Sequence, residues 1–445
     1  MKIVDVFLER FGAAADKTAI VTDQSSVTYQ DLRADISAWD QKLAKNGIDP
    51  GTVVLLKGDF SRDSISALFA LLKRGAIIIP LAPTSYEKSD EFAAEGHAAW
   101  TLETLSGDLT PLPHRGDHLL YDQLRESDAA GIVLFSSGST GKSKGVVHNA
   151  TNLLEKFRAP GKDFRTLAFL LFDHIAGLDT LFYSLANQST LILPSSRAPD
   201  DVCALIERHR AEVLPTAPSF LNLMLLSGAH ARHDLSSLKI VTYGSEMMAD
   251  ATLKRCAEVL PHVRLIQKYG TSEIGALPTR SRDRASTWLK LGGAGYHWRV
   301  RDGKFEIKAA TAMIGYLNAP SPFTDDGYFM TGDRVETDGD YVRFLGRDSD
   351  IINVGGQKVF PAEVESAIKE LDQIAEIAVR GIPHAILGQA VAARVRPADA
   401  RTPAAELRGL IRAHLKGRLE PYKIPQKYEI VDTPLTTDRF KTDRK

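Results

Sequence analysis

The sequence predicts an α/β protein with a large N-terminal part and a small C-terminal domain. Apolar runs at 53–56 and 76–81 flank a helical pattern at 62–74, which is the sequence form of a parallel βαβ unit. Later hydrophobic runs end in Gly, Pro or small polar residues, the turns that gather at the carboxyl ends of parallel strands. A chain of 445 residues exceeds one ordinary core, so we expect two or three domains.

The remaining elements follow from apolar periodicity. Helices are expected at 4–11, 29–43 and 62–74, and strands at 18–21, 53–56, 76–81, 131–135, 166–172, 191–194, 212–218, 239–246 and 264–267. Residues 86–130 are more polar and predict connections with one or two short elements. A small β element is expected at 305–307 and 313–316, and beyond it an α+β module with a helix from Pro361, strands at 374–379 and 390–395, and a helix at 404–419.

The charge balance excludes several classes of partner. Lys and Arg number 55 and Asp and Glu 56, so the net charge of −1 gives no electrostatic case for nucleic acid or an anionic membrane. No apolar run approaches the ~18 residues of a membrane span, and the N-terminus lacks a signal-peptide pattern. The two cysteines, Cys203 and Cys256, match no metal spacing and suit a reduced compartment, so we expect a cytoplasmic protein.

Residues 131–148, GIVLFSSGSTGKSKGVVH, carry the strongest chemical signal. A buried strand at 131–135 leads into a Ser/Gly/Thr loop at 136–141, and Lys142 and Lys144 follow. Such a loop can turn backbone N–H groups and hydroxyls towards an anion, while the lysines add positive charge. The phosphate chain of a nucleotide is the expected ligand.

Two other interpretations of this loop stay open on its residues alone. A P-loop of the form G-x-x-x-x-G-K-[ST] matches residues 141–143, but its first glycine would fall on Ser136. A P-loop lysine also opens a helix, whereas 145–147 is extended in pattern and the next helix is expected at Asn149. A Ser/Gly-rich surface turn is the plainer alternative.

Turns further along the chain supply groups that suit a nucleotide. Residues 268–273, KYGTSE, resemble the Y-G-x-[ST]-E motif of the adenylate-forming superfamily, and this resemblance implies a flat face for adenine at Tyr269, a hydroxyl for the α-phosphate at Thr271 and an oxygen ligand for Mg²⁺ at Glu273. Residues 327–333, GYFMTGD, resemble the family's [WY]-x-x-T-G-D, which implies that Asp333 accepts hydrogen bonds from both ribose hydroxyls. A role as an ordinary turn acid is its alternative.

Together these motifs resemble the adenylate-forming superfamily, which includes acyl-CoA synthetases, aryl-acid ligases, adenylation domains and luciferases. The loop is similar to [ST]-[ST]-G-[ST]-T-G-x-P-K-G, with Ser143 in place of the proline, and Y-G-x-[ST]-E, [WY]-x-x-T-G-D, G-R-x-[DK]-D-x-I and P-x-T-x-x-G-K-x-x-R follow in the family's order. The resemblance implies a large domain of stacked, mostly parallel α/β subdomains at 1–348, with the ATP and acid sites. A small mobile α+β domain at 349–445 would carry the catalytic lysine.

The resemblance also implies the residues of the site. Lys441 is the implied catalytic lysine, with Thr140 and Glu273 as further catalytic residues and Glu273 as the Mg²⁺ ligand. Contacts to ATP or AMP are implied for Ser137, Gly138, Ser139, Thr140, Gly141, Lys142, Lys144, Gly244, Ser245, Glu246, Tyr269, Gly270, Thr271, Asp333, Phe344 and Arg347. In the tail, Leu435 takes the proline position and Phe440 replaces the glycine before Lys441. The plainer interpretation of that segment is a frayed basic tail.

The acid pocket is implied to include His174, Tyr243, Lys268 and Gly270. The large ring of Tyr243 would shorten the pocket, and a buried Lys268 ammonium would need an anionic or strongly polar partner. We therefore expect a small, aromatic or polar acid. The alternative is that Lys268 turns to solvent.

Two features of the C-terminal module bear on the second half of the reaction. Ser349 occupies the hinge position, where the family usually has Asp or Lys, and Gly355 and Gly356 would approach the acyl-adenylate after the domain reorients. The stretch GGQKVFPAEVE resembles acyl-CoA ligases, whereas amino-acid-activating domains have R-G-F-R-I-E. The implied acceptor of the acyl group is coenzyme A.

The implied function is ATP-dependent activation of a carboxylic acid through acyl-AMP, followed by thioester formation with coenzyme A. One alternative is a stand-alone adenylating enzyme that serves an acyl carrier protein or another nucleophile, or that activates a small inorganic acid such as nitrite. Another is a non-catalytic nucleotide-binding relative, which the departures at Ser143, Ser349 and Phe440 motivate. A P-loop NTPase would instead release ADP without any acid.

Overall fold

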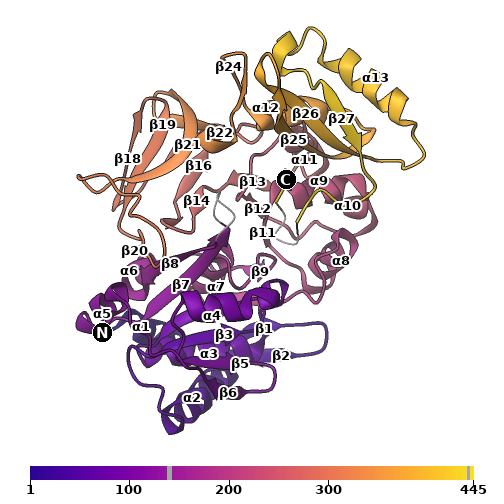
Figure 1. The fold of residues 1–445 in the computed structure, drawn as a ribbon. Coiled ribbons are helices and arrows are strands. Elements are labelled where there is room, and N and C mark those ends of the chain that lie inside the picture. The colour runs from indigo at the N-terminus through magenta and orange to yellow at the C-terminus, as the bar shows by residue number, and fades with distance from the viewer. Residues whose placement is uncertain (138–142, 438–440, 445) are drawn as a thin grey trace.

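The computed structural model describes residues 1–137, 143–437 and 441–444 of the chain. Within these residues, two seven-stranded sheets, a six-stranded sheet, a five-stranded sheet and a two-stranded ribbon build the protein. Figure 1 places the N-terminal elements at the bottom, the six-stranded sheet at the upper left and the C-terminal module at the upper right. The three parts meet near the centre of that view.

The first seven-stranded sheet is almost entirely parallel, as expected. Its strands in spatial order are β13 (Arg264–Gln267), β12 (Ile240–Tyr243), β11 (Val213–Thr216), β9 (Arg165–Leu167), β10 (Thr190–Ile192), β1 (Thr18–Val21) and β2 (Ser26–Thr28), and only β1 and β2 pair antiparallel. The carboxyl ends of β12 and β13 lie side by side, because the N–H of Lys268 donates to the carbonyl oxygen of Tyr243 at 2.7 Å. The turns after these strands therefore share one edge of the sheet.

The second seven-stranded sheet confirms the predicted βαβ unit. Its strands in spatial order are β20 (Gly315–Tyr316), β8 (Ser143–Asn149), β7 (Gly131–Ser137), β4 (Ile77–Leu81), β3 (Val53–Lys57), β5 (Trp100–Glu103) and β6 (Asp108–Pro111). Helix α3 (Arg62–Lys73) connects the parallel strands β3 and β4. The stretch 86–130 holds more structure than expected, with α4 (Ser89–Glu95), β5, β6 and α5 (Leu119–Glu126).

Helices fill the space between the two sheets. Helices α1 (Ile3–Ala13), α2 (Tyr29–Lys45), α3 and α7 (Ile175–Ala186) contribute buried residues to one continuous core that also contains residues of both sheets. On the first sheet, α8 (Pro199–His209), α9 (Pro218–Leu226) and α11 (Asp250–Val259) form a second core. The short elements α6 (Ala150–Leu154), η2 (Glu155–Phe157) and α10 (Ala229–Arg232) complete this part.

The six-stranded sheet is wholly antiparallel and larger than the small β element expected from the sequence. Its order is β16 (Thr279–Ser281), β17 (Leu289–Leu291), β22 (Tyr341–Arg347), β21 (Phe329–Asp338), β19 (Lys304–Ala309) and β18 (Tyr296–Arg301). The expected partner of the strand at 305–307 is elsewhere, since β20 pairs with β8. The ribbon β14 (Gly270–Thr271) and β15 (Gly275–Ala276) lies between this sheet and the first one in the chain.

The C-terminal module has a core of its own. Its sheet contains β24 (Gln357–Val359), β23 (Ile352–Val354), β26 (Gly388–Pro397), β25 (Ile374–His384) and β27 (Lys427–Ile430), with α12 (Pro361–Ile368), η4 (Pro421–Lys423) and α13 (Ala404–Leu415). Pro361 is the first residue of α12, as predicted, because its missing N–H has no helical partner there anyway. The sheet begins just after the predicted boundary between residues 348 and 349.

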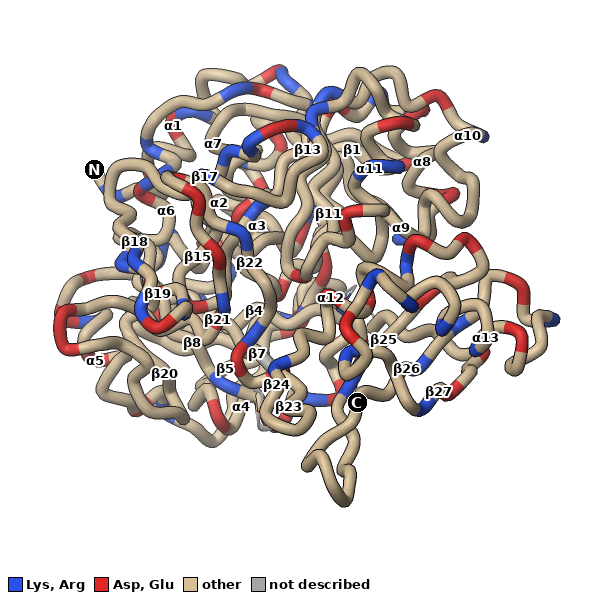
Figure 2. Tube along the Cα trace, turned by 90° about the horizontal axis from the view of Figure 1, so that it is seen from above, with Lys and Arg blue, Asp and Glu red and all other residues tan. Residues whose placement is uncertain are grey.

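The distribution of charged and apolar residues in the structure agrees with the composition of the sequence. In the view of Figure 2, Lys and Arg positions alternate with Asp and Glu positions along the trace, in keeping with the net charge of −1. Across the described ranges, no helix has both the length and the apolar character that a bilayer crossing requires.

Candidate active site

The phosphate-loop motif is carried by a β hairpin. Strands β7 and β8 pair antiparallel from Gly131 opposite Asn149 to Ser137 opposite Ser143. A strand therefore follows the loop, and the next helix, α6, begins only after Asn149, whose side chain accepts from the Thr151 N–H at 2.9 Å. The P-loop interpretation is wrong, because a P-loop lysine opens a helix.

Part of the predicted loop lies outside the described residues, namely Gly138, Ser139, Thr140, Gly141 and Lys142, and so does the side chain of Ser137. Lys144 lies on β8, and its Nζ is 5.1 Å from the centre of the Tyr316 ring on β20. The Tyr316 hydroxyl in turn donates to Glu273 Oε1 at 2.7 Å. The hairpin thus brings a lysine towards the carboxylate that was predicted to bind Mg²⁺.

The surroundings of Glu273 suit a metal ion that takes only one carboxylate from the protein and its other oxygens from phosphates and water. Its N–H donates to the Thr271 hydroxyl at 3.3 Å, so the predicted α-phosphate and metal groups are neighbours. The described residues contain no group of three or more His, Cys, Asp or Glu that could hold a metal ion. Mg²⁺ commonly binds one or two carboxylates and takes its remaining oxygens from phosphates and water. A single Glu273 carboxylate beside a phosphate site suits that pattern.

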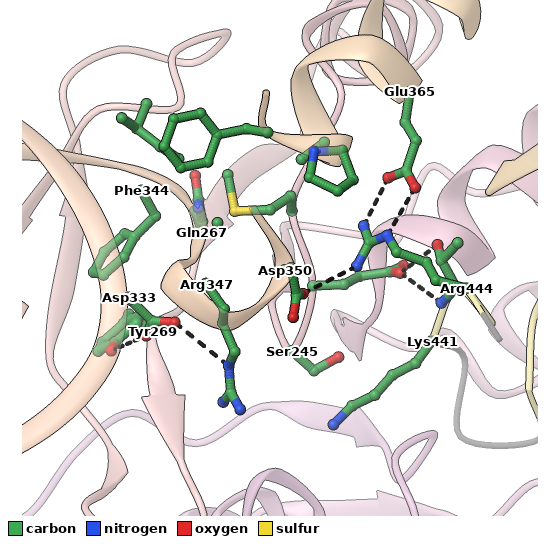
Figure 3. Close-up of a pocket in the computed structure, with 18 of the residues that line it drawn as sticks. Ser245, Gln267, Tyr269, Asp333, Phe344, Arg347, Asp350, Glu365, Lys441 and Arg444 are labelled. Atoms are coloured by element: carbon green, nitrogen blue, oxygen red, sulfur yellow. Dashed lines mark hydrogen bonds and ion pairs between the residues drawn. The ribbon is translucent and has the colours of Figure 1, made fainter. Parts of the chain in front are cut away.

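The predicted ribose and adenine residues meet at the end of the six-stranded sheet. Asp333 on β21 and Arg347 on β22 are cross-strand partners, and Arg347 Nε lies 3.5 Å from Asp333 Oδ1. The Tyr269 hydroxyl donates to the other oxygen, Oδ2, at 2.6 Å. Figure 3 shows these three side chains converging on one side of the cavity. Two strands and a turn from another sheet therefore fix one carboxylate.

Two aromatic rings form a wall beside this carboxylate. Tyr269 and Phe344 stack with their centroids 4.0 Å apart and their planes at 12°, and Phe305 meets both rings near edge-on. One face of Tyr269, predicted as the adenine platform, is thus covered by Phe344. Both stacked residues line the cavity, so a base would meet a wall of two rings.

Burial shapes the protonation of this group. Desolvation raises the pKa of the Asp333 carboxyl, although Arg347 and the hydrogen bond from Tyr269 act in the opposite direction. Desolvation and the neighbouring Asp333 raise the pKa of the Tyr269 phenol well above its ordinary value. Tyr269 therefore stays a hydrogen-bond donor at neutral pH.

The turn after β12 connects the first sheet to the C-terminal segment. A Cβ on Gly244 would lie 2.8 Å from the Lys268 carbonyl oxygen, so only glycine fits between the two adjacent turns. Ser245 has φ +71° and lines the cavity. Glu246 accepts from the Ser219 N–H at the start of α9 at 2.5 Å, and from the Thr442 N–H and hydroxyl, both at 3.3 Å.

The described part of the C-terminal tail is held in place. Arg444 donates to both oxygens of Glu365 on α12, at 2.8 and 2.7 Å, and lies 3.7 Å from Asp350. Glu365 is 6% exposed and also accepts from the Val379 N–H at 2.9 Å. These contacts contradict the interpretation of this segment as a frayed tail.

Lys441 lies on this anchored segment. Its carbonyl accepts from the Thr437 N–H at 2.9 Å, and its side chain extends into the cavity towards Arg347 and Ser245 (Figure 3). The cavity measures about 240 Å³ and is lined by residues of the first sheet, the six-stranded sheet and the C-terminal module. Lys441, Arg347 and the Asp333 carboxylate therefore line the same cavity.

Sequence reasoning missed the groups that hold the tail. Glu365 and Asp350 were not predicted as site residues. Glu246 lines the cavity and also accepts from the Ser219 N–H and from Thr442, and its predicted contact with the nucleotide stays a prediction. A buried acid on an otherwise amphipathic helix was the available signal for Glu365, but its partner is 79 positions away.

Of the four residues predicted for the acid pocket, two line the cavity and two do not. Lys268 and Gly270 line the cavity, and a Cβ on Gly270 would lie 2.5 Å from the Gly275 carbonyl oxygen. Tyr243 is 1% exposed within the second core, and neither it nor His174 is among the residues that line the cavity. His174 precedes α7 and accepts from the Ala176 N–H through Nδ1 at 3.3 Å. The acid-pocket roles of all four stay predictions.

The comparison with protein families decides the affiliation. The model described as AMP-binding enzyme matches residues 7–99 and 88–301, and that of the AMP-binding enzyme C-terminal domain matches 363–439. The chain belongs to the AMP-binding enzyme family. The predicted relationship is confirmed, and the two matches fall on the large N-terminal part and on the C-terminal module.

Individual relatives of this AMP-binding enzyme include both ligases and synthetases. An indoleacetate–CoA ligase of Aromatoleum aromaticum is 26% identical over 478 residues, which cover 95% of this chain and 92% of the relative. A plipastatin synthase chain of Bacillus subtilis is 28% identical over 428 residues, which cover 84% of this chain and 17% of that protein. The solved structure of an anthranilate CoA ligase with anthranoyl-AMP aligns with a TM-score of 0.83 and 22% identity over 100% of this chain and 96% of that one. The predicted fold is confirmed.

The hinge and the glycine turn lie outside the cavity of this AMP-binding enzyme. Ser349 is exposed in η3 (Asp348–Asp350), and its hydroxyl donates to Asp350 Oδ1 at 2.9 Å. Gly355 and Gly356 have φ +58° and +87°, as the tight turn between β23 and β24 requires. Neither glycine lines the cavity, and the roles of all three residues stay predictions.

Proposed function

We propose that this AMP-binding enzyme is an ATP-dependent acid–CoA ligase, which activates a carboxylic acid as acyl-AMP and transfers the acyl group to coenzyme A. The single observation that carries the proposal is the convergence of Asp333, Arg347 and Lys441 on one cavity walled by Tyr269 and Phe344. A carboxylate for ribose, aromatic rings for a base and cations for phosphate are the complement of a nucleotide.

In the first step, an oxygen of the acid attacks the α-phosphorus of ATP. The new P–O bond forms as the bond to the bridging oxygen breaks, and pyrophosphate leaves with that electron pair. Lys441 and Lys144 offset the negative charge that repels the two reactants, and the Asp333 group fixes the ribose so that they stay aligned. Mg²⁺ on Glu273 would supply further positive charge at the phosphates. The hydroxyl and N–H groups of residues 137–142 are assigned to the same phosphates.

In the second step, the C-terminal module reorients about Ser349. This motion withdraws Lys441 and brings the turn at Gly355 and Gly356 towards the acyl-AMP. The sulfur of coenzyme A attacks the acyl carbon, the C–S bond forms, and the C–O bond to AMP breaks. AMP leaves, and the thiol proton is released to solvent.

Two observations support coenzyme A as the acceptor. The indoleacetate–CoA ligase is related over nearly the whole length of both proteins, whereas the plipastatin synthase match covers 17% of that protein. The GGQKVFPAEVE stretch also has the pattern of acyl-CoA ligases. An acyl carrier protein is the second candidate, as the alternative acceptor of the acyl group from acyl-AMP. The names of the indoleacetate and anthranilate ligases favour an aromatic acid.

The test is acid-dependent release of pyrophosphate from ATP, measured over aryl, short-chain, long-chain and dicarboxylic acids with and without coenzyme A. We expect AMP, pyrophosphate and a new thioester when one of the acids and coenzyme A are both present. Pyrophosphate release that coenzyme A does not accelerate would move the acceptor to a carrier protein or another nucleophile. ADP as the product would contradict the proposal.

A further inference from the structure

Among the described residues, the Lys268 side chain has no protein partner, although it lines the cavity. Lys268 follows β13, lines the cavity and is exposed. Within residues 1–137, 143–437 and 441–444, its ammonium makes no hydrogen bond and no ion pair, whereas its backbone N–H is bound to Tyr243. Its position beside Tyr269 and Gly270 places it at the same cavity as the proposed reaction.

The charges around Lys268 leave an excess of positive charge. The charged groups that act on it are Asp179 on α7 and Lys156 on η2. These two are already paired, because Lys156 donates to Asp179 and also to the Ala276 carbonyl oxygen, at 3.0 Å. The pair is neutral as a whole, so no carboxylate remains in it to balance Lys268.

The nearest charged neighbours of Lys268 differ from those of Arg347. Asp179 on α7 and Lys156 on η2 act on Lys268, whereas Asp333, Glu273, Tyr269 and Asp350 act on Arg347. The two cations therefore lie in different charge environments of one cavity.

The Lys268 side chain is open to the cavity, and no carboxylate of the described residues pairs with its ammonium. A ligand that brings an anionic group would form a charge-assisted hydrogen bond with it. Phosphate groups are already served by Lys144, Lys441 and Arg347.

We propose that Lys268 binds a second carboxylate, at the end of the acid away from the reacting group, so that dicarboxylic acids are the preferred substrates. This inference rests on the proposed function. One carboxylate of the substrate reaches the α-phosphate near Thr271 and Lys441, and the other forms an ion pair with Lys268. A monocarboxylic acid of the same length leaves the ammonium unpaired.

The test compares each diacid with its own monomethyl ester, which keeps the carbon chain between the two carbonyl groups, adds one methyl group and removes one charge. Pyrophosphate release is measured with succinate, glutarate, adipate and isophthalate and with their four monoesters. For at least one pair, we expect kcat/KM of the wild-type enzyme to be about ten- to a hundredfold higher for the diacid, the range of a hydrogen bond to a charged group. Lys268→Met should bring that ratio close to one, mainly through a higher KM for the diacid, and Lys268→Arg should retain most of it.

The control is Lys254→Met, the same substitution at an exposed lysine of α11 that does not line the cavity, and it should keep the wild-type ratio. An unchanged melting temperature of Lys268→Met shows that the fold is intact. Equal efficiency with diacids and monoesters in every pair, or a preference that survives in Lys268→Met, would overturn the inference and leave the ligase proposal standing. If no acid releases pyrophosphate, both fail.

Discussion

Asp333 is the residue proposed to bind the ribose. Its two oxygens are approached by Tyr269 at 2.6 Å and Arg347 at 3.5 Å, and its side chain is 13% exposed. Both neighbours hold the carboxylate in one orientation, with its remaining lone pairs available to a ribose. A substitution here changes the binding group without removing the wall of aromatic rings.

Asp333→Asn should therefore weaken ATP binding and leave the fold intact. The amide keeps the shape of the side chain but loses the charge that strengthens hydrogen bonds from two hydroxyls. We expect the KM for ATP to rise about ten- to a hundredfold. Asp338→Asn on the same strand is the control, because Asp338 is 65% exposed and pairs with Arg282 at the surface. An unchanged KM in Asp333→Asn would contradict the ribose assignment.

The raised pKa of Asp333 predicts a pH dependence with a definite sign. Burial disfavours the ionised form, so the folded protein releases this proton at a higher pH than an ordinary Asp, near 3.9. Only the ionised carboxylate accepts from both ribose hydroxyls. The KM for ATP should thus rise as the pH falls through that raised value, and Asp333→Asn should lack this step. A step at or below pH ~4 would contradict the assignment.

The same shift affects stability in the opposite direction. A carboxyl whose folded pKa is raised stabilises the protein fully only below its unfolded pKa, near 3.9. That contribution of Asp333 is lost as the pH rises through the folded value. We expect bound nucleotide to offset the loss, because its ribose hydroxyls would donate to the ionised form.

For single residues, the sequence predicted the chemical role of a side chain better than it predicted which side chains it contacts. Residue type and motif context predicted one site for Tyr269, Asp333 and Arg347, and the structure brings the three side chains together. Their contacts with a nucleotide stay predictions. Stacking of Tyr269 on Phe344 could not be predicted, since the two rings come from different sheets and lie 75 positions apart. Tyr243 was expected at the acid pocket but is 1% exposed, because an aromatic ring at the end of a strand fits a core equally well.

Among the elements, the C-terminal hairpin holds Lys441 in position. The bridge between Thr436 and Thr442 closes the hairpin, Thr442 binds Glu246, and Arg444 binds Glu365. Glu365 is 6% exposed and Arg444 32% exposed, so their bidentate pair is partly shielded from solvent. These contacts anchor the segment that carries Lys441.

Arg444→Met should impair the first half-reaction more than the second. The substitution leaves the Glu365 carboxylate with the Val379 N–H as its remaining hydrogen bond, at a cost of about 1–3 kcal/mol. The loosened hairpin misplaces Lys441, which should lower the rate of acyl-AMP formation by up to about a hundredfold. The rate of thioester formation from supplied acyl-AMP should change little. Arg418→Met is the control, since Arg418 pairs with Glu370 where both side chains are more exposed. An equal loss in both half-reactions would refute this role.

Strands were predicted correctly where one face or both faces of the strand are buried. The strands β3, β4 and β13 were predicted within a residue or so, because short, fully apolar or alternating runs are bounded by turn residues. The six-stranded sheet was largely missed. Its edge strand β18, YHWRVR, has no buried residue, so it shows no apolar alternation. The strand predicted at 166–172 is shorter, since regular pairing ends at Leu167.

In the whole molecule, several polar contacts between the C-terminal module and the part of the protein built on the first sheet are individually weak. Asn222 donates to the Ala375 carbonyl oxygen at 3.0 Å, Arg255 pairs with the exposed Asp372 at 2.9 Å, and Glu246 accepts from Thr442. Exposed ion pairs contribute only about 0.2–1 kcal/mol each. Weak attachments of this kind, together with a core of its own, support the proposed reorientation of the module.

The family, the fold class and the two-part organisation could be predicted from the sequence because five motifs occur in order along the chain. The relative position of the two parts could not, because it depends on single contacts such as Arg255 with Asp372. Those contacts have no periodicity and no motif. The structure supplies this level of organisation, and it places Lys441 in the cavity.

Under the proposed function, both half-reactions take place in one cavity, and Lys441 acts in the first of them. The most direct test of this proposal is the Lys441→Ala variant, with acyl-AMP formation and thioester formation from supplied acyl-AMP measured separately, and Lys427→Ala on β27 as the control. We expect acyl-AMP formation to fall roughly a hundred- to a thousandfold, the effect of removing one group that stabilises developing charge. Thioester formation should continue at the wild-type rate. Acyl-AMP formation at the wild-type rate, or an equal loss of both half-reactions, would contradict the account.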